Sequence, residues 1–224
     1  MAAIEPTDKN VAQPERIKKY SRNLRFWHWA NALVIFGSLL TVLVNATLND
    51  RSTITPVIQN ELAKSGVTVT AQQANGVGHE LKDKVWEVHT YFGYALAALL
   101  LFRLGLEFFQ LADQKFIRVL KSAITQFRVK KGNREPARHE LVVKTLYSLF
   151  YLVLIVMALT GLFLAFEDLL APFKYLRHSV KEIHGFCMYL VLAFIAVHII
   201  GVLLAERKDS RGIVSDIING GGLE

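Results

Sequence analysis

The stretch KEIHGFCMYLVLAFIAVHIIGVLL, residues 181–204, places two histidines on one long apolar segment. His184 and His198 are fourteen residues apart, which is two heptads, so on a helix both imidazoles project from nearly the same face. At a rise of about 1.5 Å per residue the rings lie about 21 Å apart along the axis, inside a hydrocarbon core about 30 Å thick. One ring is then near each membrane surface. A single metal cannot bridge them, but two separate cofactors can bind there.

The composition indicates an integral membrane protein. Of the 224 residues, 52% are hydrophobic, and the mean hydropathy is +0.31, which is too apolar for an ordinary soluble chain of this length. Four segments are each close to the roughly 20 residues needed to cross a bilayer. Their approximate bounds are 26–46, 88–109, 141–165 and 183–205. The sequence therefore predicts an all-α, four-helix membrane bundle, residues 26–205, between polar tails at 1–25 and 206–224.

Two features limit how the chain reaches the membrane and holds a cofactor. The polar tail contains Pro6 and Pro14 and has no apolar region close to its start, so it does not resemble a signal peptide. The first span is then expected to act as an uncleaved anchor. The single cysteine, Cys187, excludes an internal disulfide and the C-x-x-C-H attachment of a c-type haem. Any haem must be held without a covalent bond.

The net charge of +7 follows the distribution expected of a membrane protein, so nucleic-acid binding is not predicted. Lys and Arg number six in residues 1–25, eight in the 110–140 connection and three after Ala205. They number four in 47–87 and three in 166–182, where acidic residues offset them. The positive-inside rule then places both termini in the cytoplasm.

The first outer connection, residues 47–87, is long enough to fold. Thr55 followed by Pro56 has the form of an N-cap and a first helical residue, so a short helix lying on the membrane is expected. A second helix is expected to start after Thr70 and to be interrupted at Gly76 and Gly78.

The cytoplasmic connection 110–140 mixes apolar residues at helical intervals with many lysines and arginines. This pattern is typical of an amphipathic helix held against anionic lipid headgroups. A docking surface for a partner protein is the alternative.

The topology sorts the histidines of the spans into two pairs. His28 begins the first span and His198 is near the end of the fourth, so both are near the cytoplasmic surface. His89 begins the second span and His184 begins the fourth, so both are near the outer surface. A single histidine in a span can be explained as an interfacial residue, but four histidines at two matched depths are harder to explain in this way. Ionisable groups are costly within a span and are usually functional.

Imidazole is a suitable axial ligand of haem iron, because one ring nitrogen binds the metal while the other donates a proton that fixes the ring. The spacing therefore predicts two non-covalent b-type haems, one between His28 and His198 and one between His89 and His184. Gly93, one turn after His89, would let a flat porphyrin approach the helix backbone, although small residues equally serve helix packing.

Basic residues close to these histidines are candidates to pair with haem propionates at the membrane surface. They are Arg22, Arg25, Arg177 and Lys181. The same positions would be basic simply to anchor the helix ends.

Polar residues at the cytoplasmic ends of the second and third spans are candidates for a quinone site, since quinone carbonyls need donors and a proton path. They are Arg103, Glu107, His139 and Lys144. The alternative is that Arg103 and Lys144 only anchor helices and Glu107 pairs with one of them.

The remaining histidines and the tryptophans support no other chemistry. His79 and His178 lie in outer connections and are expected to be solvated. Neither His79 nor His139 begins an H-E-x-x-H motif, so zinc hydrolysis has no support. Trp27 and Trp29 are expected to form an interfacial aromatic belt.

The chain resembles the bacterial di-haem b-type cytochromes, which include the membrane subunits of nickel-iron hydrogenases and formate dehydrogenases and the related cytochrome b-561 proteins. The matching motifs are R-x-x-R-F-W-H-W at 22–29, H-T-Y-F-G-Y at 89–94 with F-R at 102–103, and H-x13-H at 184–198. In that family the fourth helix gives one ligand to each haem, and the first and second helices complete the cytoplasmic and outer haems. The resemblance implies electron transfer across the bacterial inner membrane between a partner and quinone.

Two functions compete under this interpretation. The first is an electron-transfer subunit, because no catalytic motif is present and both irons should be six-coordinate. Its partner would be a hydrogenase-like or other dehydrogenase subunit, or a c-type cytochrome. The second is a self-sufficient oxidoreductase that handles quinone or a small oxidant. A transporter or haem-handling chaperone would need broken helices or a polar pathway, and the sequence contains neither.

Overall fold

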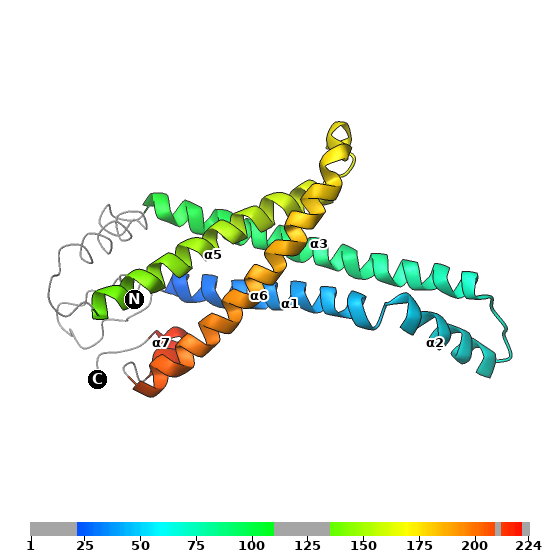
Figure 1. The fold of residues 1–224 in the computed structure, drawn as a ribbon, viewed down its shortest axis with the longest axis horizontal. Coiled ribbons are helices and arrows are strands. Elements are labelled where there is room, and N and C mark those ends of the chain that lie inside the picture. Colours follow the sequence, from blue (N-terminus) through cyan, green and yellow to red (C-terminus); the bar gives the residue numbers. More distant parts are fainter. Residues whose placement is uncertain (1–21, 110–134, 209–211, 221–224) are drawn as a thin grey trace. The chain divides into compact units, whose positions relative to one another are not determined.

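The computed structural model describes residues 22–109, 135–208 and 212–220, and every regular element in those ranges is a helix. The elements are α1 (Arg22–Thr47), α2 (Arg51–Lys64), α3 (Ala71–Phe109), α5 (Glu135–Ala165), the 3-10 helix η3 (Ala171–Leu176), α6 (Arg177–Lys208) and α7 (Ile213–Asn219) (Figure 1). Most of the predicted amphipathic connection 110–140 lies outside the described residues.

Among the residues that the structure describes, four stretches are long and apolar enough to cross a membrane: Arg22–Thr47, Ala71–Gly105, Leu141–Ala165 and Ala171–Arg207. The four spans expected from hydropathy fall inside α1, α3, α5 and α6, and each helix extends beyond its apolar stretch at one end or both. A helix pairs its own backbone N–H and C=O groups, so it can continue beyond the apolar stretch without leaving these groups unpaired.

The chain divides into two compact units. One is Ala30–Ala98, and the other combines Met1–Trp29 with Leu99–Glu224. The first unit contains most of α1, all of α2 and most of α3. The second contains the first residues of α1, the end of α3, and the helices from α5 onward.

In the unit Ala30–Ala98, α2 begins earlier than the sequence predicted. The cap of α2 is Asp50, whose carboxylate accepts from the Ser52 backbone N–H at 3.0 Å, so Pro56 lies inside the helix and the prediction of Thr55 as the cap was wrong. An acidic N-cap five residues upstream outweighs the one backbone hydrogen bond that proline removes.

The start of α3 after Thr70 agrees with the prediction, but the interruption does not occur. Thr70 and Gln73 form a capping box, with Thr70 N to Gln73 Oε1 at 2.9 Å and Gln73 N to Thr70 Oγ1 at 3.2 Å. The helix then continues through both glycines to Phe109. Gly78 packs so closely that a Cβ there would lie 2.9 Å from Ile54 Cγ2 on α2. That glycine therefore serves helix packing.

In the other unit, η3 lies in the turn between α5 and α6, and the two long helices pack against each other. Leu154 and Ala158 of α5 are 1% and 8% exposed, and Cys187 and Val191 of α6 are 6% and 4% exposed. Cys187 is a buried free cysteine, as expected of a small apolar residue.

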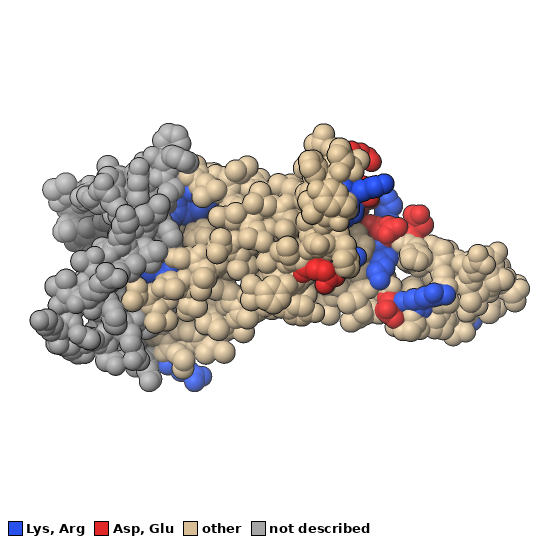
Figure 2. Space-filling model, turned by 45° about the horizontal axis from the view of Figure 1, so that its top comes forward, with Lys and Arg blue, Asp and Glu red and all other residues tan. Residues whose placement is uncertain are grey.

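The outer surface of the helices is unusually apolar for a protein in water. Leu33, Phe36, Leu101, Leu159 and Phe186 are all more than 60% exposed. Figure 2 shows that most of the visible surface of the described residues bears no Lys, Arg, Asp or Glu. An exposed apolar surface of this extent is that of a protein solvated by lipid.

Candidate functional site

His28 of α1 and His198 of α6 face each other within one unit. Their ring centres are 6.3 Å apart, their planes are inclined at 52°, and both side chains are partly buried. Two metal–imidazole bonds of about 2.0–2.1 Å, together with the two ring radii, span a separation of this size. The Nδ1 atom of His28 is buried and has no hydrogen-bond partner within the described ranges. The pair thus fits a metal held between two imidazoles.

Aromatic side chains hold these two rings in place. Phe194, one turn before His198 on α6, stacks on it with ring centres 5.8 Å apart and planes 9° apart. Phe194 also stacks on Phe150 of α5 at 3.9 Å and 13°. On the other side, Trp29 presents its edge to His28 at 5.2 Å and 88°. Packing on both rings limits their rotation before any metal binds.

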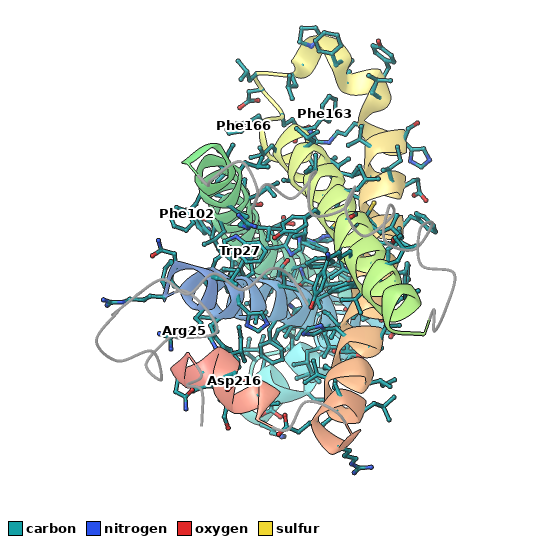
Figure 3. All side chains as sticks on the ribbon, turned by 90° about the vertical axis from the view of Figure 1, so that its left-hand side faces the viewer. Arg25, Trp27, Phe102, Phe163, Phe166 and Asp216 are labelled. Carbon is teal, nitrogen blue, oxygen red and sulfur yellow. The ribbon has the colours of Figure 1, made fainter. Side chains whose placement is uncertain are left out.

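The C-terminal helix α7 contacts the start of α1 beside His28. Arg25 Nη1 donates to the Ile218 carbonyl oxygen at 2.8 Å, and Trp29 Nε1 donates to the Ile217 carbonyl oxygen at 3.2 Å. Figure 3 shows Arg25 near the α7 turn that bears Asp216. The candidate propionate partner Arg25 is therefore already bonded through Nη1, while its Nε atom is buried without a partner among the described residues.

His89 on α3 has its hydrogen-bonding partners on α1, within the unit Ala30–Ala98. Its Nδ1 atom is 2.9 Å from Thr41 Oγ1, 3.3 Å from Ser38 Oγ and 3.3 Å from the Ser38 carbonyl oxygen. Gly93, one turn later on α3, has no described atom within 4 Å of the position a Cβ would take. Open space beside Gly93 is what a flat ligand near His89 would need.

His184 on α6 is bonded to α5 in the other unit. Its Nδ1 atom is 2.9 Å from Thr160 Oγ1. A Cβ at Gly161 would lie 3.2 Å from His184 Cε1, so an alanine there would require this ring to move by a few tenths of an ångström. His89 and His184 belong to different units. Their pairing therefore stays a prediction.

The other candidate propionate partners are near the surface. Arg177 Nη2 forms an ion pair with Glu167 Oε2 at 2.7 Å, with the two side chains 37% and 67% exposed. Arg22 and Lys181 are exposed.

Two of the four candidate quinone residues have described side chains. Arg103 Nε donates to the Tyr151 hydroxyl at 3.3 Å, and Tyr151 stacks on Trp27 at 5.7 Å. Lys144 is 6% exposed and lies well inside α5, because the helix begins at Glu135, so it does not reach out from a helix end. The side chains of Glu107 and His139 lie outside the described residues.

Trp27 is not part of an interfacial belt. It is 8% exposed, and its Nε1 atom donates to the Leu99 carbonyl oxygen at 3.0 Å. Trp29 is 48% exposed but is bonded to α7. The belt prediction was wrong for Trp27, because it faces the end of α3 and Tyr151.

Four hydroxyl residues in contact with candidate site residues were missed in the sequence. Ser38 and Thr41 contact His89, Thr160 contacts His184, and Tyr151 contacts Arg103. The available signal was their position inside apolar spans, where a hydroxyl must find a partner. Threonine often satisfies this need on its own helix, so the sequence alone does not indicate which threonines also contact a histidine.

Comparison with known families gives a match over most of the chain. A family model described as prokaryotic cytochrome b561 matches residues 19–220, a range that includes all four candidate ligands. No curated protein matches the chain, and no solved structure matches it.

Proposed function

This protein belongs to the prokaryotic cytochrome b561 family, and from that premise we propose that it holds two non-covalent b haems, one through His28 and His198 and one through His89 and His184. Membership makes the chain an all-α membrane protein that binds b-type haem and transfers electrons. The number of haems, their ligands and the electron donors and acceptors are parts of the proposal.

The observation that supports the ligand assignment best is the 6.3 Å separation of the His28 and His198 rings. The two rings come from α1 and α6 and are packed by Phe194 and Trp29. A haem closed by two imidazoles supplies one-electron chemistry and leaves no coordination site for a substrate. The role of the chain is then to orient the rings and to exclude water from them.

The proposed pathway crosses the bacterial inner membrane, with both termini in the cytoplasm. The excess of Lys and Arg in the tails and in 110–140 supports this orientation. Electrons would pass between a redox partner and the quinone pool. The partner is a hydrogenase-like or other dehydrogenase subunit, or a c-type cytochrome. Co-purification from the native membrane tests this: a stable redox partner supports a subunit role, and a chain that oxidises quinol alone supports the self-sufficient alternative.

Haem extraction and histidine variants test the ligand assignment. Acid-acetone should remove two haems per chain, and one haem or a haem that resists extraction would contradict the proposal. His198→Ala should remove the inner haem and His184→Ala the outer one, while exposed His178→Ala should remove neither. Loss of the same spectral component in both ligand variants would contradict the pairing.

The proposed quinone site lies on the cytoplasmic side, near Arg103, Glu107, His139 and Lys144. Its support is the contact from Arg103 to Tyr151 and on to Trp27, the neighbour of His28 in the chain. A guanidinium and a phenol held together can donate to quinone carbonyl oxygens.

The quinone proposal is tested by the rate of quinone-dependent haem oxidation, measured after haem content has been checked. Arg103→Gln and Tyr151→Phe should slow oxidation about tenfold or more, within the range that positioned acid–base groups contribute. Glu107→Gln, His139→Ala and Lys144→Gln extend the test to the remaining candidates. Tyr189→Phe, at a tyrosine that is 65% exposed, is the matched control. Unchanged rates in all five variants would remove these residues from the site.

A further inference from the structure

The two proposed outer ligands share one arrangement, although they lie in different units. His89 Nδ1 is 2.9 Å from the Thr41 hydroxyl, and His184 Nδ1 is 2.9 Å from the Thr160 hydroxyl. In both cases the threonine is on the neighbouring helix, α1 in one unit and α5 in the other.

In both places the threonine hydroxyl donates its proton to a carbonyl oxygen of its own helix. Thr41 Oγ1 donates to the Ser38 carbonyl oxygen at 2.6 Å, and Thr160 Oγ1 donates to the Val156 carbonyl oxygen at 2.6 Å. A hydroxyl has one proton, so each oxygen turns a lone pair toward the histidine. Each threonine therefore accepts the imidazole N–H.

A second contact also indicates that His89 Nδ1 is a hydrogen-bond donor. Its Nδ1 atom is also 3.3 Å from the Ser38 carbonyl oxygen, which can only accept. Both histidines thus have the proton on Nδ1 and the lone pair on Nε2, the tautomer that an axial ligand requires. The inner ligand His28 differs, since its buried Nδ1 atom has no hydrogen-bond partner within the described part of the chain.

We propose that Thr41 and Thr160 are positioning residues that fix the tautomer of the outer ligands and lower the midpoint potential of the outer haem. A carbonyl-anchored hydroxyl that accepts the N–H strengthens electron donation from the imidazole to iron, which favours the ferric form. The inference rests on the proposed ligation by His89 and His184.

Redox titration of valine variants tests this role. Thr41→Val and Thr160→Val keep the branched shape but remove the acceptor, so each should raise the midpoint potential of the outer haem and leave that of the inner haem unchanged. The expected shift corresponds to about a tenfold change in the ratio of oxidised to reduced haem, about 59 mV for a one-electron couple. Thr41→Ser and Thr160→Ser retain the hydroxyl and should keep the wild-type potential.

Two threonines serve as matched controls, since they bond to a helix carbonyl in the same way but contact no imidazole in any described bond. Thr47 Oγ1 donates to the Leu43 carbonyl oxygen at 2.7 Å, and Thr90 Oγ1 donates to the Trp86 carbonyl oxygen at 3.1 Å. Thr47→Val and Thr90→Val should leave both potentials unchanged.

Each outcome decides the proposal. A missing shift in either valine variant, or an equal shift in its serine counterpart, overturns the role of that threonine. If a valine variant loses the outer haem, retention in the serine variant supports the hydroxyl role and loss in both overturns it. Failure of the underlying ligation is recognised separately, because His184→Ala would then keep the outer haem.

Discussion

Arg25 Nη1 donates to the Ile218 carbonyl oxygen at 2.8 Å, a bond between residues 193 positions apart in the chain. It fastens α7 to the start of α1, next to His28. A seven-residue helix is too short to be stable alone, so α7 depends on such contacts. Glu206 supports it from α6 by accepting from the backbone N–H groups of Gly212 and Val214 at 2.8 and 3.3 Å.

Replacing Arg25 should loosen α7. The shorter side chain of Arg25→Gln cannot keep the bond to Ile218. Losing one hydrogen bond costs about 1 kcal/mol, which increases the population of undocked α7 about fivefold. Trypsin cleavage at the exposed Arg207, at the end of α6, should become about fivefold faster in detergent. The exposed Arg22→Gln is the control, and equal rates in the two variants would contradict the prediction.

The two tryptophans of α1 should differ in their contribution to stability. Trp27→Phe leaves the Leu99 carbonyl without its indole donor at a site that is 8% exposed, which costs about 1–3 kcal/mol. Trp29→Phe removes a bond at a site that is 48% exposed, where water replaces the donor. Thermal denaturation in one detergent should show the larger loss for Trp27→Phe. A larger loss for Trp29→Phe would be the contrary result.

The sequence predicted the four spans and their approximate positions because apolar length is the dominant signal of a membrane helix. It also paired His28 with His198 from topology and depth. Their rings lie 6.3 Å apart in the structure, and haem ligation by the two histidines stays a prediction. The predictions that failed concerned positions at which the local sequence allowed two different arrangements. Thr55 was a plausible cap, but Asp50 was available upstream. Trp27 is of a residue type common at membrane interfaces, but it is buried and donates to the Leu99 carbonyl oxygen.

Gly161 should be required for the position of His184 in a way that Gly185 is not. A Cβ at Gly161 would lie 3.2 Å from His184 Cε1, so Gly161→Ala must move the ring by a few tenths of an ångström. At Gly185 no described atom lies within 4 Å of the added Cβ. Alanine favours a helix interior over glycine by about 1 kcal/mol, so neither change should unfold its helix.

Haem content and the absorption maximum of the outer haem measure the effect of these glycine variants. Gly161→Ala should lower the occupancy or shift the maximum, and Gly185→Ala should match the wild type. Identical spectra for all three proteins would show that the close contact at Gly161 does not orient the ligand.

The start of α2 should weaken at acid pH. The Ser52 hydroxyl, and then its backbone N–H, donate to Asp50 and hold the pKa of that carboxyl below its usual range. A lowered pKa in the folded state stabilises the cap above the unfolded pKa, and this contribution is lost as pH falls through the folded pKa. Asp50→Asn remains a good cap but does not titrate.

Hydrogen exchange of the first amides of α2 measures this effect. Protection in the wild type should fall relative to Asp50→Asn as pH drops below the usual range of an aspartate. A constant ratio between the two proteins across that interval would contradict it.

The length of α3 has a consequence for any protein that delivers or accepts electrons. Its 39 residues extend about 58 Å, roughly twice the thickness of the hydrocarbon core. His89 lies about 27 Å from the first residue, Ala71. In the proposed orientation, α2 and the first residues of α3 project from the outer membrane surface, and the Thr55–Asn75 hydrogen bond at 2.6 Å joins the two helices. A protein that contacts only the far end of α3 would stay too far from His89 for rapid electron transfer. A redox partner on this side must therefore also contact the side of α3 close to His89.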